Sequence, residues 1–215
     1  MKTTNRLIIG VVTVLLACTA AQAQSSEKEL KKDLKAKVEK DCRKTAKQLE
    51  KEGWKVMPGK LPLEKQVQAS RYAELDTDKD GEKLYLTATH RAVGGNYSAA
   101  KKIADDRATT ELAERVSKTI SEMVKGKLSS TDYGDGDIET IDEFVSANKN
   151  LVSVSLESVF PVLEIYREKD NKVEVMVMVK TNAAKALKAA KKAYKDKLYQ
   201  QSADLAKELD ELLPY

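Results

Sequence analysis

Apolar residues recur at intervals of three or four along three long stretches of the chain, which is the period of one face of an α-helix. The pattern predicts helices over residues 27–52, 96–128 and 183–213. The last of these has a coiled-coil-like stripe and, with roughly 30 residues, would be about 45 Å long. That length exceeds the width of a three-stranded sheet, so we expect its far half to pack on the N-terminal helix or on another molecule.

Two shorter helices are predicted between the long ones. Pro62 suits the first position of a helix over residues 62–75, because a proline there gives up no helical hydrogen bond. A second short helix is predicted over residues 138–148, after a loop rich in serine, aspartate and glycine. Gly53 marks the end of the first long helix.

Alternating apolar and polar residues predict three strands. Residues 83–91 alternate regularly, residues 151–167 lose their alternation part-way, and residues 173–180 give the clearest strand. The loss of alternation predicts a bulge or bend, and Pro161 agrees with it, because proline in a sheet belongs at an edge or a bulge. Residues 168–172 are predicted to form a hairpin turn.

The strand over residues 173–180 is apolar on both faces. Valines occupy alternate positions on one face, and Met176 and Met178 interrupt the other. Such a strand should be covered on both sides, either by the helix near residues 61–75 or by a second copy or a partner. The two methionines are therefore candidate interface residues, with core filling as the default interpretation.

The start of the chain has the plan of a secretory signal, with Lys2 and Arg6, an apolar run, and small residues before a cleavage site. Cleavage between Ala23 and Gln24 would release a periplasmic or secreted protein. The alternative is a lipobox at Cys18, whose acylation would make the protein an outer-membrane lipoprotein. A stable membrane span takes about 20 residues, and the run is shorter, so we expect membrane attachment only through an acylated cysteine.

These elements predict an α+β fold, in which a small antiparallel sheet of about three strands packs against long helices, with an N-terminal helix and a long C-terminal helix. After a signal peptide over residues 1–23, a helix and linker over residues 24–60 would precede one α+β domain over residues 61–215. Beyond the signal the sequence has a single cysteine, Cys42. Its place on the apolar stripe indicates a packed small hydrophobe.

Charge gives no indication of a nucleic-acid partner. The chain has 38 basic and 34 acidic residues, and removal of the signal with its two basic residues leaves 36 against 34, a net charge of about +2. Because the signs are mixed along the predicted helices, we expect a solvated surface and no nucleic-acid binding.

The sequence contains one candidate metal turn and one histidine. Asp76, Asp78 and Asp80 have the spacing of the first ligands of an EF-hand-like calcium loop, but Thr87 stands where the closing glutamate is needed. We therefore expect a solvated turn, with calcium binding as the alternative. His90 is the only histidine, and the sequence has no hydrolase, zinc, redox or phosphate-loop motif. We predict a protein that is not an enzyme and has no cofactor.

Several segments resemble known proteins. The helix YSAAKKIADDRATTELAERVSKTISEMV and the later strands VLEIYREKDNKVEVMVMVK, followed by a long helix, resemble the bacterial LPP-twenty lipoprotein family. LPLEKQ and GGNYSAAK are also similar to uncharacterised exported proteins of Gram-negative anaerobes. The resemblance covers about residues 83–195 and implies an α+β cell-envelope protein without known enzymatic activity. The family's acylated cysteine would correspond to Cys18.

Together these features predict an exported cell-envelope protein with a structural or interaction role. A homo-oligomer or another envelope protein is the expected partner. The alternative hypothesis is a periplasmic module that binds a small ligand or calcium through the turn at residues 76–80.

Overall fold

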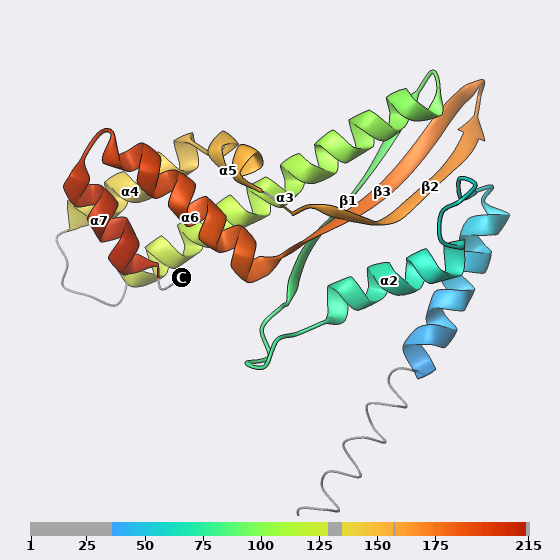
Figure 1. The fold of residues 1–215 in the computed structure, drawn as a ribbon, viewed down its shortest axis with the longest axis horizontal. Helices are drawn as coiled ribbons and strands as arrows, with labels where there is room; N and C mark the ends of the chain where they lie inside the picture. The colour runs from blue at the N-terminus through green and yellow to red at the C-terminus, as the bar shows by residue number, and fades with distance from the viewer. Residues whose placement is uncertain (1–35, 129–134, 157, 214–215) are drawn as a thin grey trace, which may run out of the picture. The chain divides into compact units, whose positions relative to one another are not determined.

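The structure is a computed structural model that describes residues 36–128, 135–156 and 158–213 (Figure 1). The chain divides into two compact units, residues 1–44 and residues 45–215. The sheet and all the helices that cover it belong to the second unit.

The N-terminal helix is described over residues 36–51. Gly53 follows the end of the helix with a φ of 86°, a left-handed conformation that glycine adopts without steric cost. The predicted end of this helix is therefore confirmed. Cys42 is buried, with 4% of its surface exposed, as expected for a packed residue.

A three-stranded antiparallel sheet forms the centre of the second unit. Strands β1 (Tyr85–Gly94), β2 (Phe160–Lys169) and β3 (Lys172–Asn182) lie in the order β1-β3-β2, so the strand predicted most clearly is the central one. Asp170 and Asn171 join β2 to β3 with φ angles of 50° and 59°, the backbone conformation of a two-residue hairpin turn. The predicted α+β fold with a small antiparallel sheet is confirmed.

Strand β2 starts later than the sequence pattern predicted. The preceding residues form helix α5 (Asn150–Ser155), in which Val152 is fully buried and Val154 is 90% exposed. Residues two apart share a face in a strand but point in nearly opposite directions in a helix, so the prediction of a strand here was wrong. The predicted bulge is confirmed, because the register of β2 shifts between Pro161 and Leu163 on this edge strand.

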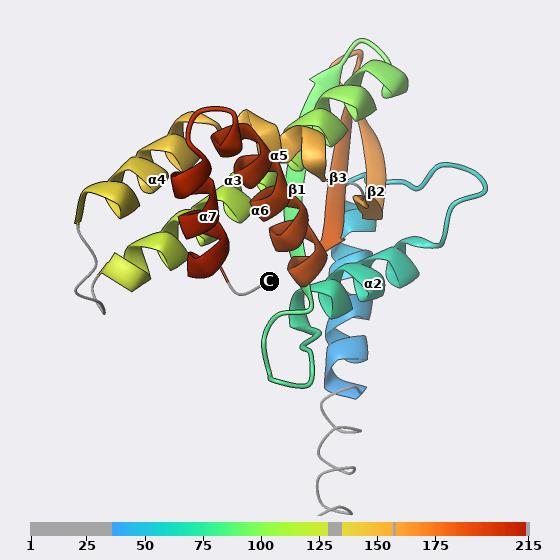
Figure 2. The ribbon, with the colours of Figure 1, turned by 60° about the vertical axis from the view of Figure 1, so that its left-hand side comes forward.

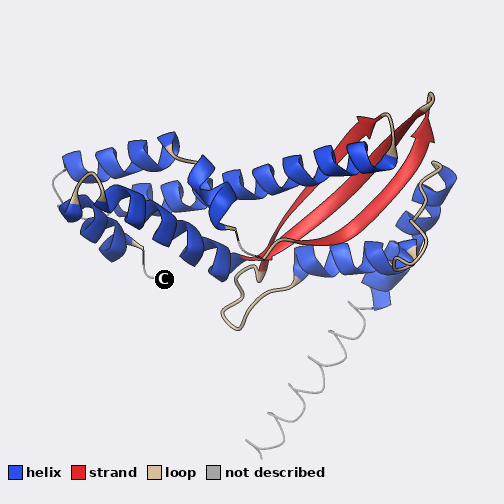
Figure 3. Ribbon diagram, turned by 45° about the horizontal axis from the view of Figure 1, so that its top comes forward, coloured by secondary structure: helices blue, strands red, loops and turns tan. Residues whose placement is uncertain are grey.

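Helix α3 (Tyr97–Leu128) covers one face of the sheet with small side chains (Figure 3). Alanines of α3 and β1 and valines of β3 form a shared core: Ala88, Ala92, Ala100, Ala104, Ala108, Leu112, Val175, Val177 and Val179. The approach is closest at Gly94, where an added Cβ would lie 2.6 Å from the backbone nitrogen of Ala100. Asn96 then caps the helix by accepting a hydrogen bond from the N–H of Ala99 at 2.9 Å.

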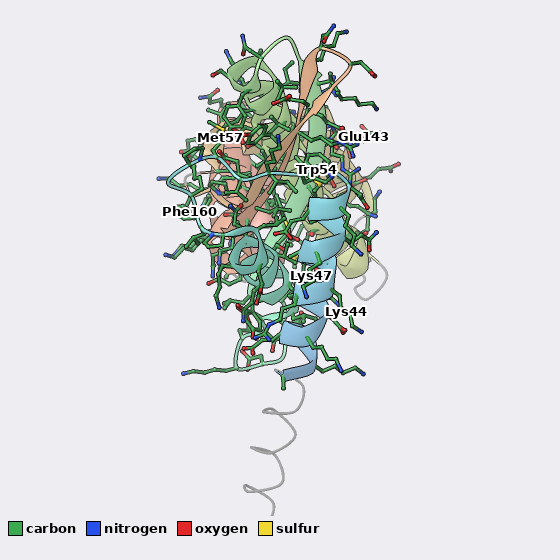
Figure 4. The ribbon with its side chains drawn as sticks, turned by 90° about the vertical axis from the view of Figure 1, so that its right-hand side faces the viewer. Lys44, Lys47, Trp54, Met57, Glu143 and Phe160 are labelled. Carbon is green, nitrogen blue, oxygen red and sulfur yellow. The ribbon has the colours of Figure 1, made fainter. Side chains whose placement is uncertain are left out.

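Helix α2 (Leu63–Leu75) and Trp54 cover the opposite face of the sheet (Figures 3 and 4). The helix packs against β2 and β1. Trp54 is 2% exposed, and the guanidinium groups of Arg91 and Arg167 lie 5.5 Å and 4.6 Å from the centre of its ring. These are cation–π contacts between the two outer strands and the tryptophan. The predicted cover of the second face by this helix is confirmed.

The outer edge of β2 is closed by residues that lie before and within α2. Lys55 exchanges two backbone hydrogen bonds with Tyr166, at 2.7 Å and 2.9 Å. The side chain of Gln66 accepts a hydrogen bond from the N–H of Glu164 and donates one to the carbonyl of Leu61, both at 2.7 Å. The bonds of Lys55 with Tyr166 and of Gln66 with the N–H of Glu164 satisfy backbone groups that an exposed edge strand leaves open.

The C-terminal half of α3 belongs to a second core, which it forms with α5 and three further helices (Figure 2). These are α4 (Asp135–Ala147), α6 (Ala183–Tyr199) and α7 (Ala203–Leu212). Tyr194 of α6 is fully buried there, and its hydroxyl lies 3.0 Å from the hydroxyl of Ser117 on α3. None of the described helices is both long and apolar enough to cross a membrane.

The predicted single helix over residues 183–213 is two helices, so that prediction was wrong. Ser202 begins the second helix, since its hydroxyl accepts a hydrogen bond from the N–H of Leu205 at 3.3 Å. Asp204 in the first turn adds a favourable interaction with the helix dipole. Helix α7 folds back on α6 and buries Leu209 there, so the far half packs on its own chain beside α6.

Candidate functional site

The C-terminal helices form a groove of about 580 Å³ that is lined mainly by lysines, the lysine groove. Most of its lining comes from one face of α6, with one residue from the segment before β2 and one from α7. Its members are Ser158, Lys185, Lys188, Ala189, Lys191, Lys192, Lys195 and Asp210.

Helix α6 divides into an apolar and a basic face. The buried face packs into the helical core through Ala186, Leu187, Ala190, Tyr194 and Leu198. The rest of its 17 residues include six lysines and a single acidic residue, Asp196. This helix therefore departs from the mixed signs that describe the chain as a whole.

Two lysines of the groove stabilise α7. Lys191 is only 7% exposed, and its ammonium group donates to the backbone carbonyls of Asp210, at 3.0 Å, and Leu213. Lys191 and Lys195 also pair with the Asp210 carboxylate at 2.8 Å and 2.7 Å. Hydrogen bonds from these two lysines lower the pKa of Asp210 to about 2. Because carbonyls at a helix end lack helical partners, this contact caps the C-terminus of α7.

The remaining lysines of the groove have no such role. Lys185, Lys188 and Lys192 are exposed, and within the described residues the ion pairs of the groove involve only Lys191 and Lys195. Three and four residues apart on a helix, like charges repel each other. Lys185 also lies in the first turn of α6, which has no acidic residue and where the helix dipole disfavours cations. An anion in the groove would relieve both unfavourable interactions.

A second polar site, the Glu164 cluster, consists of Glu164, Tyr97, Lys101 and Lys60. Glu164 on β2 is 6% exposed, and one of its oxygens accepts a hydrogen bond from the Tyr97 hydroxyl. Its other oxygen lies 3.4 Å from the ammonium nitrogen of Lys101 and 3.5 Å from that of Lys60. Tyr97 and Lys101 are one turn apart on α3, and Lys60 precedes α2. The cluster thus joins three segments that are distant in sequence.

The residues of the Glu164 cluster shift one another's pKa values. Burial favours a neutral Glu164, but the hydrogen bond from Tyr97 and the charges of Lys101 and Lys60 outweigh it and lower the pKa of Glu164 below its ordinary value. Burial and the bond to Glu164 raise the pKa of Tyr97 above its ordinary value. For Lys101, burial acts to lower the pKa, but Asp105 and Glu164 together raise it. Both carboxylate oxygens are engaged, so the cluster stabilises the fold.

The aspartate turn holds its shape through its own backbone. One oxygen of Asp78 accepts hydrogen bonds from the N–H groups of Asp80, at 2.9 Å, and Glu82, at 3.0 Å. Gly81 completes the turn with a φ of 83°. In the part of the chain that the structure describes, no three His, Cys, Asp or Glu side chains are grouped to hold a metal ion, and this includes Asp76, Asp78 and Asp80.

Met176 and Met178 lie inside the protein, with 5% and 4% of their surfaces exposed. The Arg91 side-chain Nε lies 3.1 Å from the Met176 sulfur. Core filling, the default interpretation, is therefore what the structure shows, and these residues are not a candidate interface, because the chain's own segments already cover this face. His90 is half-buried in β1 opposite Val177, on the face that α3 covers.

Sequence reasoning missed both the lysine groove and the Glu164 cluster. The groove had a signal, since α6 has six lysines and one acidic residue, but the near balance of charge over the whole chain concealed it. The only sign of the cluster is a glutamate between Leu163 and Ile165 in an apolar strand. Its partners are 63 to 104 residues away, because they are Lys60, Tyr97 and Lys101.

No protein-family model matches the chain, and no curated protein matches its sequence. The resemblance to the LPP-twenty family stays a prediction. Cleavage between Ala23 and Gln24 and acylation of Cys18 also stay predictions, because these residues lie outside the described part of the chain. The geometry of the lysine groove therefore carries the functional argument.

Proposed function

We propose that the protein is a non-enzymatic interaction protein of the cell envelope that binds a multivalent anion in the lysine groove. The signal-like segment over residues 1–23 and the resemblance to the LPP-twenty family support a place in the envelope. The observation that carries the binding function is a set of exposed lysines that have no acidic partner among the described residues, namely Lys185, Lys188 and Lys192.

The dimensions of the groove favour an anion with several charged groups. Seven residues separate Lys185 from Lys192, a rise of about 10 Å along the helix. A single phosphate or carboxylate cannot contact ammonium groups at both ends of such a row. The volume of about 580 Å³ lies within the usual range for ligand sites, roughly 300–1,000 Å³. Several anionic groups on one ligand would therefore neutralise the row together.

A non-enzymatic role is supported by the two carboxylates of these sites, because each is already bound by side chains of the protein. In the Glu164 cluster the carboxylate is saturated by Tyr97, Lys101 and Lys60. In the groove, Asp210 is saturated by Lys191 and Lys195. Neither carboxylate is placed to accept a proton from a substrate, and the three exposed lysines act as fixed positive charges.

Titration calorimetry with sodium tripolyphosphate at low salt tests the proposal. The test variant reverses the charge of the row: Lys185→Glu, Lys188→Glu and Lys192→Glu. A matched control makes the same change at exposed lysines elsewhere: Lys79→Glu, Lys102→Glu and Lys172→Glu.

We expect the wild-type protein to bind and its affinity to fall as salt is raised, because salt screens exposed charges. With a factor of about five for each lysine, the test variant should lose at least about 100-fold in affinity, and the control should lose far less. Equal affinities of the test and control variants would refute the proposal, since net charge and not the groove would then determine binding.

A further inference from the structure

We infer that the multivalent anion is a lipid bilayer surface with anionic headgroups, on which the lysine groove docks with Tyr199 as an aromatic anchor. The inference rests on the proposed function and adds the identity of the partner.

The exposed lysines continue into a longer stripe on α6. The intervals along it are three, four, three and four residues, which keep all members on one face of a helix. The stripe consists of Lys185, Lys188, Lys192, Lys195 and Tyr199. Tyr199, at its end, is 66% exposed and is one of the most exposed large apolar side chains of the described residues.

A straight stripe of this length suits a flat partner. From Lys185 to Tyr199 the rise along the helix is about 21 Å. A compact anion such as tripolyphosphate can contact only part of it, whereas a plane of headgroups can contact its three exposed lysines and Tyr199 together. Binding to a membrane surface can therefore gain free energy from several residues of the stripe at once.

The side chains of the stripe also suit an interface between water and lipid. Lysine can bury its apolar stem while its ammonium group stays among the headgroups. Tyrosine prefers the same layer, because its ring is apolar and its hydroxyl is polar. Basic side chains together with an aromatic residue are typical of helices that bind a membrane surface.

A second exposed apolar side chain lies on a neighbouring helix. Val154 of α5 is 90% exposed, the largest exposed fraction among the large apolar residues that the structure describes. Helix α5 packs against α6, and Ser158, four residues after Val154, lines the groove. Val154 is therefore a candidate second apolar contact with the bilayer, where its side chain would leave water.

Vesicle co-sedimentation of the full chain tests the inference. One set of vesicles contains phosphatidylcholine alone, and the other adds phosphatidylglycerol as the anionic lipid. Residues 1–23 are identical in all variants, so differences between variants report on the groove. The variants are the triple lysine reversal, Tyr199→Ser, and Leu75→Ser as a control at a 48% exposed leucine on α2.

We expect the wild-type protein to sediment more strongly with the anionic vesicles, and the triple reversal to lose at least about 100-fold in affinity for them. Tyr199→Ser should weaken vesicle binding several-fold and leave tripolyphosphate binding unchanged. Leu75→Ser should behave like the wild type in both assays.

Three other outcomes would overturn the inference. Binding of tripolyphosphate without a preference for anionic vesicles would refute the lipid partner and leave the proposed function standing. Failure to bind either probe would refute both. Vesicle binding that Tyr199→Ser or the triple reversal leaves unchanged would show that the stripe is not the contact surface.

Discussion

Replacing Glu164 with glutamine keeps the size of the side chain and removes the negative charge at the centre of the Glu164 cluster. The hydrogen bond from Tyr97 becomes a bond to a neutral amide, and such bonds contribute about 1 kcal/mol less than bonds to a charged group. Lys60 is half exposed and Lys101 is 28% exposed, so each lost ion pair accounts for at most about 1 kcal/mol. We expect the free energy of unfolding to fall by about 2 kcal/mol, and the Tm by about 4–8 °C.

The effect should depend on pH in a defined direction. The pKa of Glu164 is lower in the folded protein than its ordinary value of 4.5, so the folded state favours the ionised carboxylate. Its contribution to stability is therefore fully present above pH 4.5 and is lost as the pH falls through the folded pKa. The difference in stability between wild type and Glu164→Gln should shrink in the same interval.

Urea unfolding at a series of pH values from neutral down to the acid range measures both effects. Glu143→Gln is the matched control, since Glu143 is exposed on α4 and its replacement should leave stability nearly unchanged. A Glu164→Gln variant as stable as the control at neutral pH would refute the assignment of the cluster as a stabilising element. A difference that stays constant below pH 4.5 would refute the proposed charge state.

Three further substitutions test the packing around the sheet and the groove by thermal unfolding. Lys191→Met should destabilise the protein by about 1–3 kcal/mol, because the carbonyls of Asp210 and Leu213 lose a buried donor; no loss would show that water replaces the cap. Gly94→Ala should cost about 1–3 kcal/mol, because its Cβ would meet backbone at 2.6 Å. Gly126→Ala on α3, where a Cβ meets nothing within 4 Å, should instead stabilise by up to about 1 kcal/mol. Equal effects of the two glycine substitutions would contradict the close approach of α3 to β1.

The sheet could be predicted from the sequence because its signals are local. The alternation in β3, the turn at Asp170 and Asn171, and the bulge near Pro161 depend on neighbouring residues. Signals of this kind depend on residues only a few positions apart, so the sequence pattern alone is enough to predict the strands and their turn.

The errors arose where burial decided between two local possibilities. The valines before β2 suit a strand or a helix, and only the burial of Val152 with the exposure of Val154 shows the helix. The apolar spacing continues past Ser202, so the end of α6 depends on whether that serine caps a new helix. The Glu164 cluster could not be predicted, because its four residues meet only after the sheet and α3 have packed.

The closed edge of β2 keeps strands of other molecules from pairing with the sheet. All the groups that close it come from residues 55–66, through the backbone of Lys55 and the side chain of Gln66. A chain that loses this short stretch, by proteolysis or truncation, would leave β2 as an open template for strands of other copies. We therefore expect residues 55–66 to protect the protein against aggregation through β2.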